Sequence, residues 1–458
     1  MRVLIISTNR ENLPDPVAPL GAAYVAAAVK NAGYDVRLLD LQFVVDVQVA
    51  LKDAVRMIKP HIVGLSIRNI DNVAFPHSIS YLPELGSVVR TLKALGIKLI
   101  VPGGSAFTLM PVLLLRALDL NIGIVGEGED SFPELIRRIA AGLPVNNLPG
   151  LAYSHGGEYR VNSPRKIPDL DNIAAPDRSL IENSLYMGEG GAGNIQTKRG
   201  CPFTCLYCTY PLVEGRKVRM RSPAAAAAEF ESAVKDYGLR HIFIVDNVFN
   251  SPAEHAKEFC RELIKRDVDA GWSCYVSPGG VDEELAGLML KAGCKGVEFG
   301  TDSAVDSVLA ELKKGFTREE IISASRTCAD AGLPFCHSLL LGSPGDTADT
   351  VAETLDVMDH IRPNAVIAML GVRVFPGTEL AKRAKSEGAI KDDPGLRPVF
   401  YFSPGLDMGR VSEILGSYGR ERPNFIMPGI HLRMTDKIRN RLRSYGFTGP
   451  LWEYLRHG

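Results

Sequence analysis

The sequence lacks three features that would each place it in a well-known class of proteins. Its formal net charge is only -1, so it has no basic excess of the kind found in dedicated nucleic-acid-binding proteins. No apolar run reaches the roughly 18 residues that span a bilayer, and the first residues lack the apolar core of a signal peptide. We therefore expect a cytoplasmic protein without a membrane span and without a nucleic-acid partner.

Cysteine is missing from the first 200 residues, and all eight cysteines come later in the chain. Secreted disulfide scaffolds are shorter and much denser in cysteine, so a cytosolic protein with reduced thiols is expected. Cys201, Cys205 and Cys208 form a tight C-x3-C-x2-C group that is typical of metal binding. Cys260, Cys274, Cys328 and Cys336 fall in helical or strand-like patterns, where we expect core residues.

The length of 458 residues suggests two or three domains, and the first of these is predicted over residues 1–142. Short apolar runs at 3–7, 35–40, 61–67, 98–104 and 122–129 alternate with helical patterns. Near-continuous apolar strands of this kind predict a doubly wound, Rossmann-like parallel sheet, which binds ligands at the carboxyl ends of its strands. The glycines at 103, 104, 126 and 128 lie at those ends, where they favour close approach of a ligand or, alternatively, an ordinary tight turn.

The remainder of the chain divides into three further segments. Residues 143–192 are rich in Pro, Gly and Asn and predict a linker with a small hairpin around residues 155–157. Residues 193–390 repeat strand and helix patterns and predict a partial (β/α)6 barrel with active residues at the carboxyl ends of its strands. Residues 391–458 predict a short, mainly helical extension. Its basic helix covers the barrel mouth or lines the substrate pocket or, as most of its charges favour, is a solvated surface helix.

The cysteine triplet allows two interpretations. A structural zinc site normally takes four ligands, and neither Cys260 nor His241 obviously supplies a fourth. An iron–sulfur cluster also uses cysteine thiolates in tight loops. Three thiolates on a four-iron cluster leave one iron open for a substrate or cofactor, which explains why the group has three members.

Two parts of the sequence resemble the cobalamin-dependent radical SAM enzymes. The triplet, with Tyr207 before its last cysteine, is similar to the radical SAM signature. The segments PLGAAYVAAAVKNAGYDVRLLD, GGS and VGEGEDSF are similar to the cobalamin-binding domain that precedes many radical SAM domains. The resemblance implies a 4Fe–4S cluster on Cys201, Cys205 and Cys208, together with S-adenosylmethionine (SAM) and cobalamin. No D-x-H-x-x-G motif is present, so no histidine ligand to cobalt is expected.

The resemblance also implies residues that contact each cofactor. For the SAM side these are Tyr207, Asp246, Asn247, Asp302, Ser303, Ser338 and Arg373, of which Arg373 is expected to pair with the SAM carboxylate. For the cobalamin side they are Ser66, Arg68, Gly103, Gly104, Ser105, Gly126, Glu127, Gly128 and Glu129. A guanidinium carries no lone pair for cobalt, so Arg68 below the corrin would leave that metal without a strong lower ligand. Each residue also has a structural alternative, such as a helix cap, a turn or an ion pair of Arg68 with Asp71.

The expected activity is methylation of an unactivated carbon of a small molecule. The cluster would cleave SAM, and cobalamin would deliver the methyl group. Alternatives are a cyclisation or rearrangement without methyl transfer, polar methylation from methylcobalamin, and a cobalamin- or metal-binding regulatory protein without activity. We expect a monomer with an external electron donor such as flavodoxin or ferredoxin. The sequence does not indicate the substrate.

Overall fold

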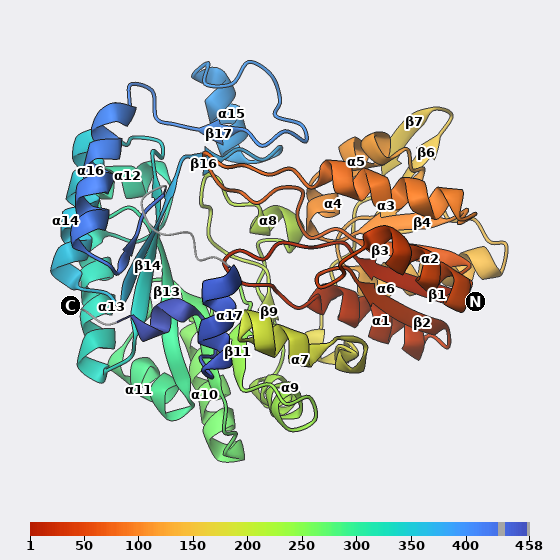
Figure 1. Cartoon of the computed structure of the whole chain (residues 1–458), viewed down its shortest axis with the longest axis horizontal. Helices are drawn as coiled ribbons and strands as arrows, with labels where there is room; N and C mark the ends of the chain where they lie inside the picture. The colour runs from red at the N-terminus through yellow and green to blue at the C-terminus, as the bar shows by residue number, and fades with distance from the viewer. Residues whose placement is uncertain (429–435, 456–458) are drawn as a thin grey trace.

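A computed structural model describes residues 1–428 and 436–455 of the chain. Figure 1 shows two lobes: an N-terminal lobe drawn in red and orange, and a larger lobe drawn in green and blue. Helix α8 (Tyr210–Val213) and several loops of the N-terminal lobe lie between them. No helix in the described residues is both long and apolar enough to cross a membrane.

The N-terminal lobe is built on a parallel sheet of four strands in the order β2-β1-β3-β4. The strands are β1 (Arg2–Ser7), β2 (Asp35–Asp40), β3 (Ile62–Ser66) and β4 (Ile100–Gly103). The helices are α1 (Leu20–Asn31), α2 (Val47–Ile58), α3 (Leu82–Ala94), α4 (Ser105–Leu109), α5 (Pro111–Leu118) and α6 (Gly128–Ala140). Alternate residues of β1 pack on opposite sides: Val3 and Ile5 against α1 and α6, Leu4 and Ile6 against α2, α3 and α5. The predicted doubly wound sheet is confirmed.

The fifth predicted strand differs from the others. β5 (Ile122–Ile124) lies beside β4 but pairs antiparallel with β6 (Leu151–His155), which forms a hairpin with β7 (Glu158–Val161). Its three residues are too few to reach the predicted end at 129, because the chain turns at Gly126 with φ +84° and α6 begins at Gly128. The hairpin predicted around residues 155–157 is present. Further along the linker lie η1 (Leu170–Asn172), η2 (Arg178–Leu180), α7 (Asn183–Leu185) and η3 (Tyr186–Gly190).

The second lobe holds a parallel sheet of seven strands in the order β18-β15-β14-β13-β12-β11-β8, with β8 and β18 at its edges. The strands are β8 (Gly193–Ile195), β11 (His241–Ile244), β12 (Gly271–Val276), β13 (Cys294–Asp302), β14 (Phe335–Leu341), β15 (Ala365–Leu370) and β18 (Phe425–Ile426). Two short ladders accompany them: β9 (Lys198–Arg199) with β10 (Arg219–Met220), and β16 (Val372–Arg373) with β17 (Phe400–Tyr401). The helices are α9 (Pro223–Lys235), α10 (Ala253–Arg266), α11 (Glu283–Lys291), α12 (Asp306–Glu311), α13 (Arg318–Ala331), α14 (Ala348–Ile361), α15 (Glu379–Ser386) and α16 (Met408–Glu421).

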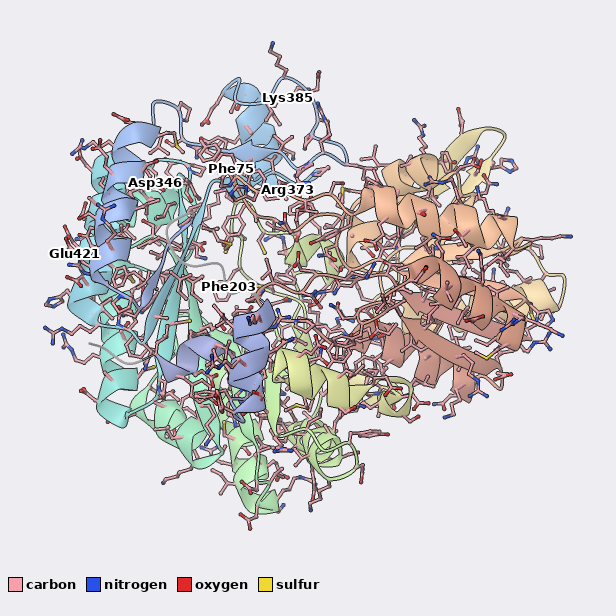
Figure 2. All side chains as sticks on the ribbon, viewed as in Figure 1. Phe75, Phe203, Asp346, Arg373, Lys385 and Glu421 are labelled. Atoms are coloured by element: carbon pink, nitrogen blue, oxygen red, sulfur yellow. The ribbon has the colours of Figure 1, made fainter. Side chains whose placement is uncertain are left out.

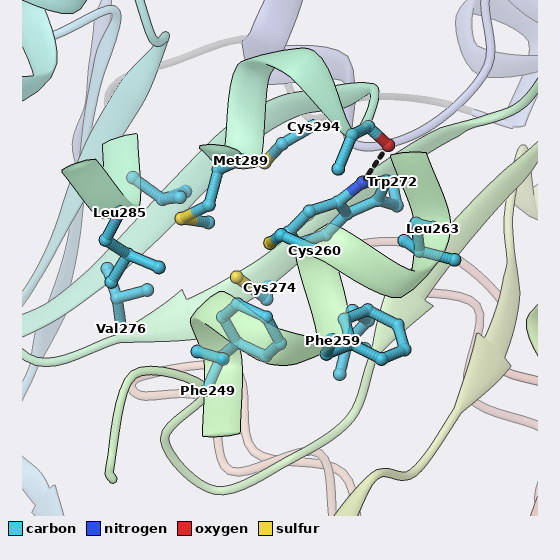
Figure 3. Close-up of a cluster of buried hydrophobic side chains, with 14 of the residues drawn as sticks. Phe249, Phe259, Cys260, Leu263, Trp272, Cys274, Val276, Leu285, Met289 and Cys294 are labelled. Atoms are coloured by element: carbon cyan, nitrogen blue, oxygen red, sulfur yellow. Dashed lines mark hydrogen bonds between the residues drawn. The ribbon is translucent and has the colours of Figure 1, made fainter. Parts of the chain in front are cut away.

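The core of this lobe lies between the sheet and its outer helices. Trp272 is fully buried there, and its indole N–H donates to the Ala292 carbonyl at 2.8 Å (Figure 3). Cys260, Cys274 and Cys294 surround this ring as small apolar side chains (Figure 3). Cys328 and Cys336 are also fully buried, so the expected core role of the cysteines outside the triplet agrees with their burial.

The last described residues of the C-terminal extension pack against the amino end of the barrel. After α17 (Asp436–Ser444), η4 (Leu451–Tyr454) places Trp452 against Gly296 and Glu453 against Ser273. These contacts lie near the amino ends of β12 and β13, whereas the predicted site lies at the carboxyl ends. The extension therefore acts as a plug, defined here as residues 448–455, rather than as a cover of the mouth.

Candidate active site

The three predicted cluster ligands share one loop at the carboxyl end of the barrel. The loop begins at Gly200, whose φ of +95° suits glycine and whose missing Cβ leaves space for the carbonyl of Lys217. The Cys201 amide donates to the Gly215 carbonyl at 3.1 Å, and the Cys208 amide donates to the Cys205 carbonyl at 3.1 Å. Backbone bonds of this kind fix the loop without using any thiol. All three sulfurs are left free for another partner.

The electrostatics of the triplet suit a cationic group. Burial raises the pKa of all three thiols, to about 12 for Cys208, and the neighbouring thiolates raise the pKa of Cys201 and Cys208 further. No three His, Cys, Asp or Glu side chains within the described ranges converge on one point as the ligands of a single ion would. Three thiols that lie near each other but do not point at a single position fit a cluster of several irons, in which each thiolate binds a different iron. The positive charge of the irons would offset the negative charge of the thiolates.

A buried group of three polar side chains, Tyr207, Asp302 and Lys314, lies beside the triplet. Asp302 accepts hydrogen bonds from the Tyr207 hydroxyl at 2.5 Å and from the Lys314 ammonium at 2.6 Å. Asp302 adopts a left-handed φ of +66°, a conformation that few residues other than glycine take up and that often marks a functional position. Tyr207 and Asp302, predicted as SAM contacts, are thus brought together beside the cysteines. Lys314 was not predicted, although it stands in the Lys-Gly pair that follows this strand.

The two residues after β11 have different surroundings. The Asp246 carboxylate is buried and accepts from the amides of Thr197 and Lys198 at 2.7 and 3.1 Å, so it fixes the approach to the cysteine loop. Asn247 donates to Glu214 at 2.7 Å, while its carbonyl oxygen is buried and has no partner among the described residues. A buried acceptor without a donor is costly, so this oxygen is the better candidate for a ligand amino group.

The two predicted serines also differ. Ser303 is buried and bonds Thr354 at 3.1 Å, so its hydroxyl serves the packing of α14. Ser338 lies on β14 and is half-buried, and its hydroxyl makes no hydrogen bond to a described residue. Of the pair, Ser338 is the one that can still receive a ligand.

The carboxyl edge of the N-terminal sheet faces the barrel. Ser7, Ser66 and Gly103 end β1, β3 and β4 in register. Gly104 has a φ of +95°, and a Cβ there would lie 2.6 Å from the Ile67 carbonyl. The Ser105 hydroxyl donates to the Arg68 carbonyl at 2.7 Å and ties the two loops together. This edge offers an open backbone surface to a ligand, which fits the bound corrin that the sequence predicts.

The acidic residues predicted to bind cobalamin have other partners. Both carboxylate oxygens of Glu127 bond Arg219, at 2.5 and 3.0 Å, and Glu129 accepts from Arg199 at 2.6 Å. Burial alone would raise the pKa of Glu127, but Arg219 and Arg199 hold it below its ordinary value. These carboxylates therefore connect the two lobes, and their predicted contact with a cofactor stays a prediction. Gly126 and Gly128 beside them are half-buried.

Arg373 likewise has a partner other than the predicted one. Its guanidinium bonds Asp71 through two nitrogens at 2.7 and 3.1 Å, and both side chains are almost fully buried. Figure 2 shows Arg373 close to Phe75, whose ring lies 4.9 Å from that of Phe402. The loop after β3 thus reaches the barrel and supplies an ion-pair partner to Arg373. The predicted pairing of Arg373 with the SAM carboxylate stays a prediction. Because Asp71 pairs with Arg373, the alternative Arg68–Asp71 pair is absent.

Arg68 is exposed at the end of β3, and its guanidinium has no hydrogen bond or ion pair to any described residue. Its charge is close enough to shift the pKa of Tyr210 in α8 and of Tyr275 in β12. Helix α4, which follows Gly104, contacts α8, which begins two residues after Cys208 (Figure 1). The loops predicted for cobalamin and for the cluster are therefore neighbours, with an unpaired cation between them.

Comparisons with known proteins agree with this arrangement. Residues 195–358 match the model of the Radical SAM superfamily, and residues 6–136 match that of the B12 binding domain. The chain is 27% identical to tryptophan 2-C-methyltransferase of Streptomyces laurentii, over 82% of this chain and 73% of that protein. It is 29% identical to the anaerobic magnesium-protoporphyrin IX monomethyl ester cyclase of Rubrivivax gelatinosus, over 80% of this chain and 66% of that one.

A solved structure matches along almost the whole chain. It is the radical SAM methyltransferase TsrM from Kitasatospora setae with cobalamin and a [4Fe-4S] cluster bound, which is 25% identical with a TM-score of 0.85. The match covers 99% of this chain and 97% of that chain. The predicted cofactors, a 4Fe–4S cluster, SAM and cobalamin, are confirmed at the level of the family. The chain is an enzyme of the cobalamin-dependent radical SAM type, because it combines a B12 binding domain with a radical SAM domain, and it is similar to methyltransferases of that type.

Proposed function

We propose that this enzyme transfers a methyl group to a carbon atom of a small molecule held between the two cofactor loops. The observation that carries the proposal is the contact of α4 with α8, because it makes the predicted cobalamin edge and the cysteine loop neighbours. When bound, the cluster and SAM supply one-electron bond cleavage, and cobalamin supplies the methyl group. The protein contributes placement of the reacting groups and exclusion of water.

The residues divide this work between them. Cys201, Cys205 and Cys208 would hold the cluster, and the unpaired carbonyl of Asn247 would accept a hydrogen bond from the SAM amino group. Tyr207, Asp302 and Lys314 would form the polar wall behind the cluster. Gly103, Gly104 and Ser105 would face the corrin.

Anaerobic reconstitution tests the proposal. The protein is loaded with iron, sulfide and cobalamin, given SAM and a reductant, and assayed for S-adenosylhomocysteine and 5′-deoxyadenosine. Tryptophan is the first substrate to try, since a relative methylates its C2. Both products together with a substrate heavier by one methylene support radical methylation. 5′-Deoxyadenosine without S-adenosylhomocysteine or a mass gain supports the rearrangement alternative instead.

A second candidate, polar methylation, is favoured by the position of Arg68. Asp71 does not neutralise its guanidinium, because Asp71 is bound to Arg373. A cation that cannot donate a lone pair, placed below cobalt, would make loss of the methyl group as a cation easier. S-Adenosylhomocysteine without 5′-deoxyadenosine supports this candidate. Exchange of Arg68 for His, which can ligate cobalt, is expected to slow methyl transfer and to shift the visible spectrum of bound cobalamin.

A further inference from the structure

The inner wall of the barrel carries a carboxyl group that the proposed chemistry does not use. Along β12 and β13, residues Trp272, Cys274, Val297 and Phe299 pack outward into the helix-covered core (Figure 3). Because side chains alternate along a strand, the intervening Tyr275 and Glu298 face the inside of the barrel. They are directly paired neighbours on adjacent parallel strands.

These inward residues have free polar groups. Glu298 is half-buried and accepts the Trp452 indole N–H at 2.9 Å through one oxygen, while its other oxygen has no partner in the described ranges. Tyr275 is 42% exposed, and its hydroxyl likewise makes no hydrogen bond to a described residue. Water can bond the free Glu298 oxygen when no ligand is bound. A substrate that donates a hydrogen bond to this oxygen would replace the water and form the bond away from solvent.

The rest of the wall is apolar and aromatic. The ring of Phe243 on β11 lies 4.9 Å from that of Tyr275 in an edge-to-face arrangement. Ile367 and the exposed Met369 continue the inner face on β15. A wall of aromatic and apolar side chains with one carboxyl group favours a flat, mainly apolar molecule that has a single hydrogen-bond donor.

The position of this wall relates it to the reaction. Tyr275 lies near enough to Arg68, at the predicted cobalamin edge, and to Tyr210, beside the cysteine loop, for both groups to affect its pKa. A molecule that rests on Tyr275 and Glu298 would therefore extend toward the space between both cofactor loops. Trp452 holds Glu298 from below, so the plug positions a group that itself meets the substrate.

We propose that Glu298 is the substrate-binding carboxylate of this enzyme. It accepts an N–H from the substrate, whose planar apolar part packs against Phe243 and Tyr275, and Trp452 is the positioning residue that orients it. The substrate class is thus a planar, mainly apolar compound with an N–H donor, either a ring N–H or an ammonium. This inference rests on the proposed function, because it places the substrate between the two cofactor loops.

Binding of three probes tests the inference without turnover. Indole offers a ring N–H, tryptamine adds an ammonium, and 1-methylindole has no donor. Affinities are measured by calorimetry on the cluster- and cobalamin-loaded protein in the absence of SAM. We expect at least one donor probe to bind about tenfold or more tightly than 1-methylindole, because 1-methylindole would leave a desolvated acceptor oxygen of Glu298 without a donor.

Three variants of Glu298 and its surroundings sharpen the test. Glu298→Leu is expected to abolish the preference for donors, whereas Glu283→Leu, at an exposed position on α11, is expected to keep it. Glu298→Gln retains an acceptor oxygen, so it should preserve indole binding if the ring N–H is the contact and weaken tryptamine binding about tenfold if the ammonium is. Trp452→Phe should weaken the donor preference severalfold while leaving the pocket walls intact.

Two results overturn the inference. One is a wild-type protein that binds none of the probes or does not distinguish donors. The other is a Glu298→Leu variant that keeps the donor preference and differs from the wild type only in a lower melting temperature. Glu298 would then only anchor the plug through Trp452. Failure of the proposed function gives a different result from failure of this inference. In that case the wild type keeps its donor preference, but neither 5′-deoxyadenosine nor S-adenosylhomocysteine forms.

Discussion

Buried carboxyl groups near the carboxyl end of the barrel mostly bond cations, whereas those further toward the amino end do not. Asp346 is an exception, since backbone amides and Thr350 hold it and burial raises its pKa to about 6. At the carboxyl end, each of four carboxylates bonds a cation: Asp71–Arg373, Glu127–Arg219, Glu129–Arg199 and Asp302–Lys314. In the middle of β13, Glu298 has no cation beside it among the described residues, and burial raises its pKa to about 7. At the amino end, Lys295 and Arg443 do not offset the burial of Glu453, whose pKa is raised to about 8. Burial also lowers the pKa of the neighbouring His241 to about 3, so this histidine is neutral.

The difference separates two tasks. Three of these ion pairs, Asp71–Arg373, Glu127–Arg219 and Glu129–Arg199, join elements from both lobes, so they fix the distance between the two predicted cofactor edges. Glu298 and Glu453 are instead held by neutral donors, Trp452 and Ser273. Their protonation state can therefore change near neutral pH. Variants at each end therefore test two expectations. The carboxyl end should depend on ion pairs for its stability, and the stability contributed by the amino end should change with pH.

The largest expected effect is at the cysteine loop. Replacement of Cys201, Cys205 or Cys208 by Ala removes a thiolate ligand and should abolish cluster-dependent SAM cleavage. Iron and sulfide content and the visible absorbance of the reconstituted protein measure the loss. Cys328→Ala is the matched control: it lies in the core and should retain the cluster with only a lowered melting temperature. Full activity in any of the three loop variants would contradict the cluster assignment.

Loss of the plug should come next. Trp452 is 6% exposed and fills the space over Gly296, so Trp452→Ala is expected to lower the free energy of unfolding by about 4 kcal/mol. Urea unfolding measures this change. Trp452→Phe, which keeps most of the ring and loses the bond to Glu298, should cost about half as much. Equal stability of the Ala variant and the wild type would show that the plug does not close the barrel.

The ion pairs between the lobes should give a smaller loss. Arg219→Ala leaves the buried Glu127 with a weaker partner, Arg199 at 4.0 Å, and should destabilise the protein by about 3 kcal/mol. Arg165→Ala is the control, because its pair with Asp130 is solvent-exposed and worth about 1 kcal/mol or less. Limited proteolysis of the linker should speed up only in the Arg219 variant. Equal losses of stability in the Arg219 and Arg165 variants would contradict the expectation that the buried Arg219–Glu127 pair holds the two lobes together.

Local sequence patterns predicted much of the fold. The apolar runs at 3–7, 35–40 and 61–67 predicted strands that the structure contains, because the strands of a sheet covered by helices need nearly continuous apolar residues. The short run at 122–124 was assigned to the parallel sheet, yet it pairs with a hairpin from the linker. Pairing partners of a three-residue strand depend on tertiary contacts that a local pattern does not contain.

The candidate site divides in the same way. The cysteine spacing is local, so the triplet could be located from the sequence. Glu127, Glu129 and Arg373 were placed at the correct strand ends, but their partners come from the other lobe, more than 65 residues away along the chain. Glu298 was missed because a single carboxyl in a strand has no motif. Its alternation with Val297 and Phe299 was the available signal.

The smallest expected effect is a change in how stability depends on pH. Glu453 faces a mixed set of groups: Ser273, His241, Lys295, Glu298 and Arg443. The unfolded chain releases the Glu453 proton near its ordinary pKa of 4.5, whereas burial lets the folded chain keep it up to about pH 8. The folded state thus binds more protons between these values, so this group lowers the free energy of unfolding as pH rises from about 5 to 8.

Glutamine at position 453 keeps an oxygen that can accept from Ser273 but does not titrate. The stability of Glu453→Gln relative to the wild type is therefore expected to increase from about pH 5 to about pH 8 and to level off above it. Urea unfolding at a series of pH values measures this difference, in which the contribution of His241 is common to both proteins. Glu387→Gln is the comparison, because Arg383 and Tyr401 hold the pKa of Glu387 below its ordinary value despite some burial, so its relative stability should stay level over this range. A difference for Glu453→Gln that is flat across the range would mean that the amino end is ionic like the carboxyl end, and the contrast between the two ends would be lost.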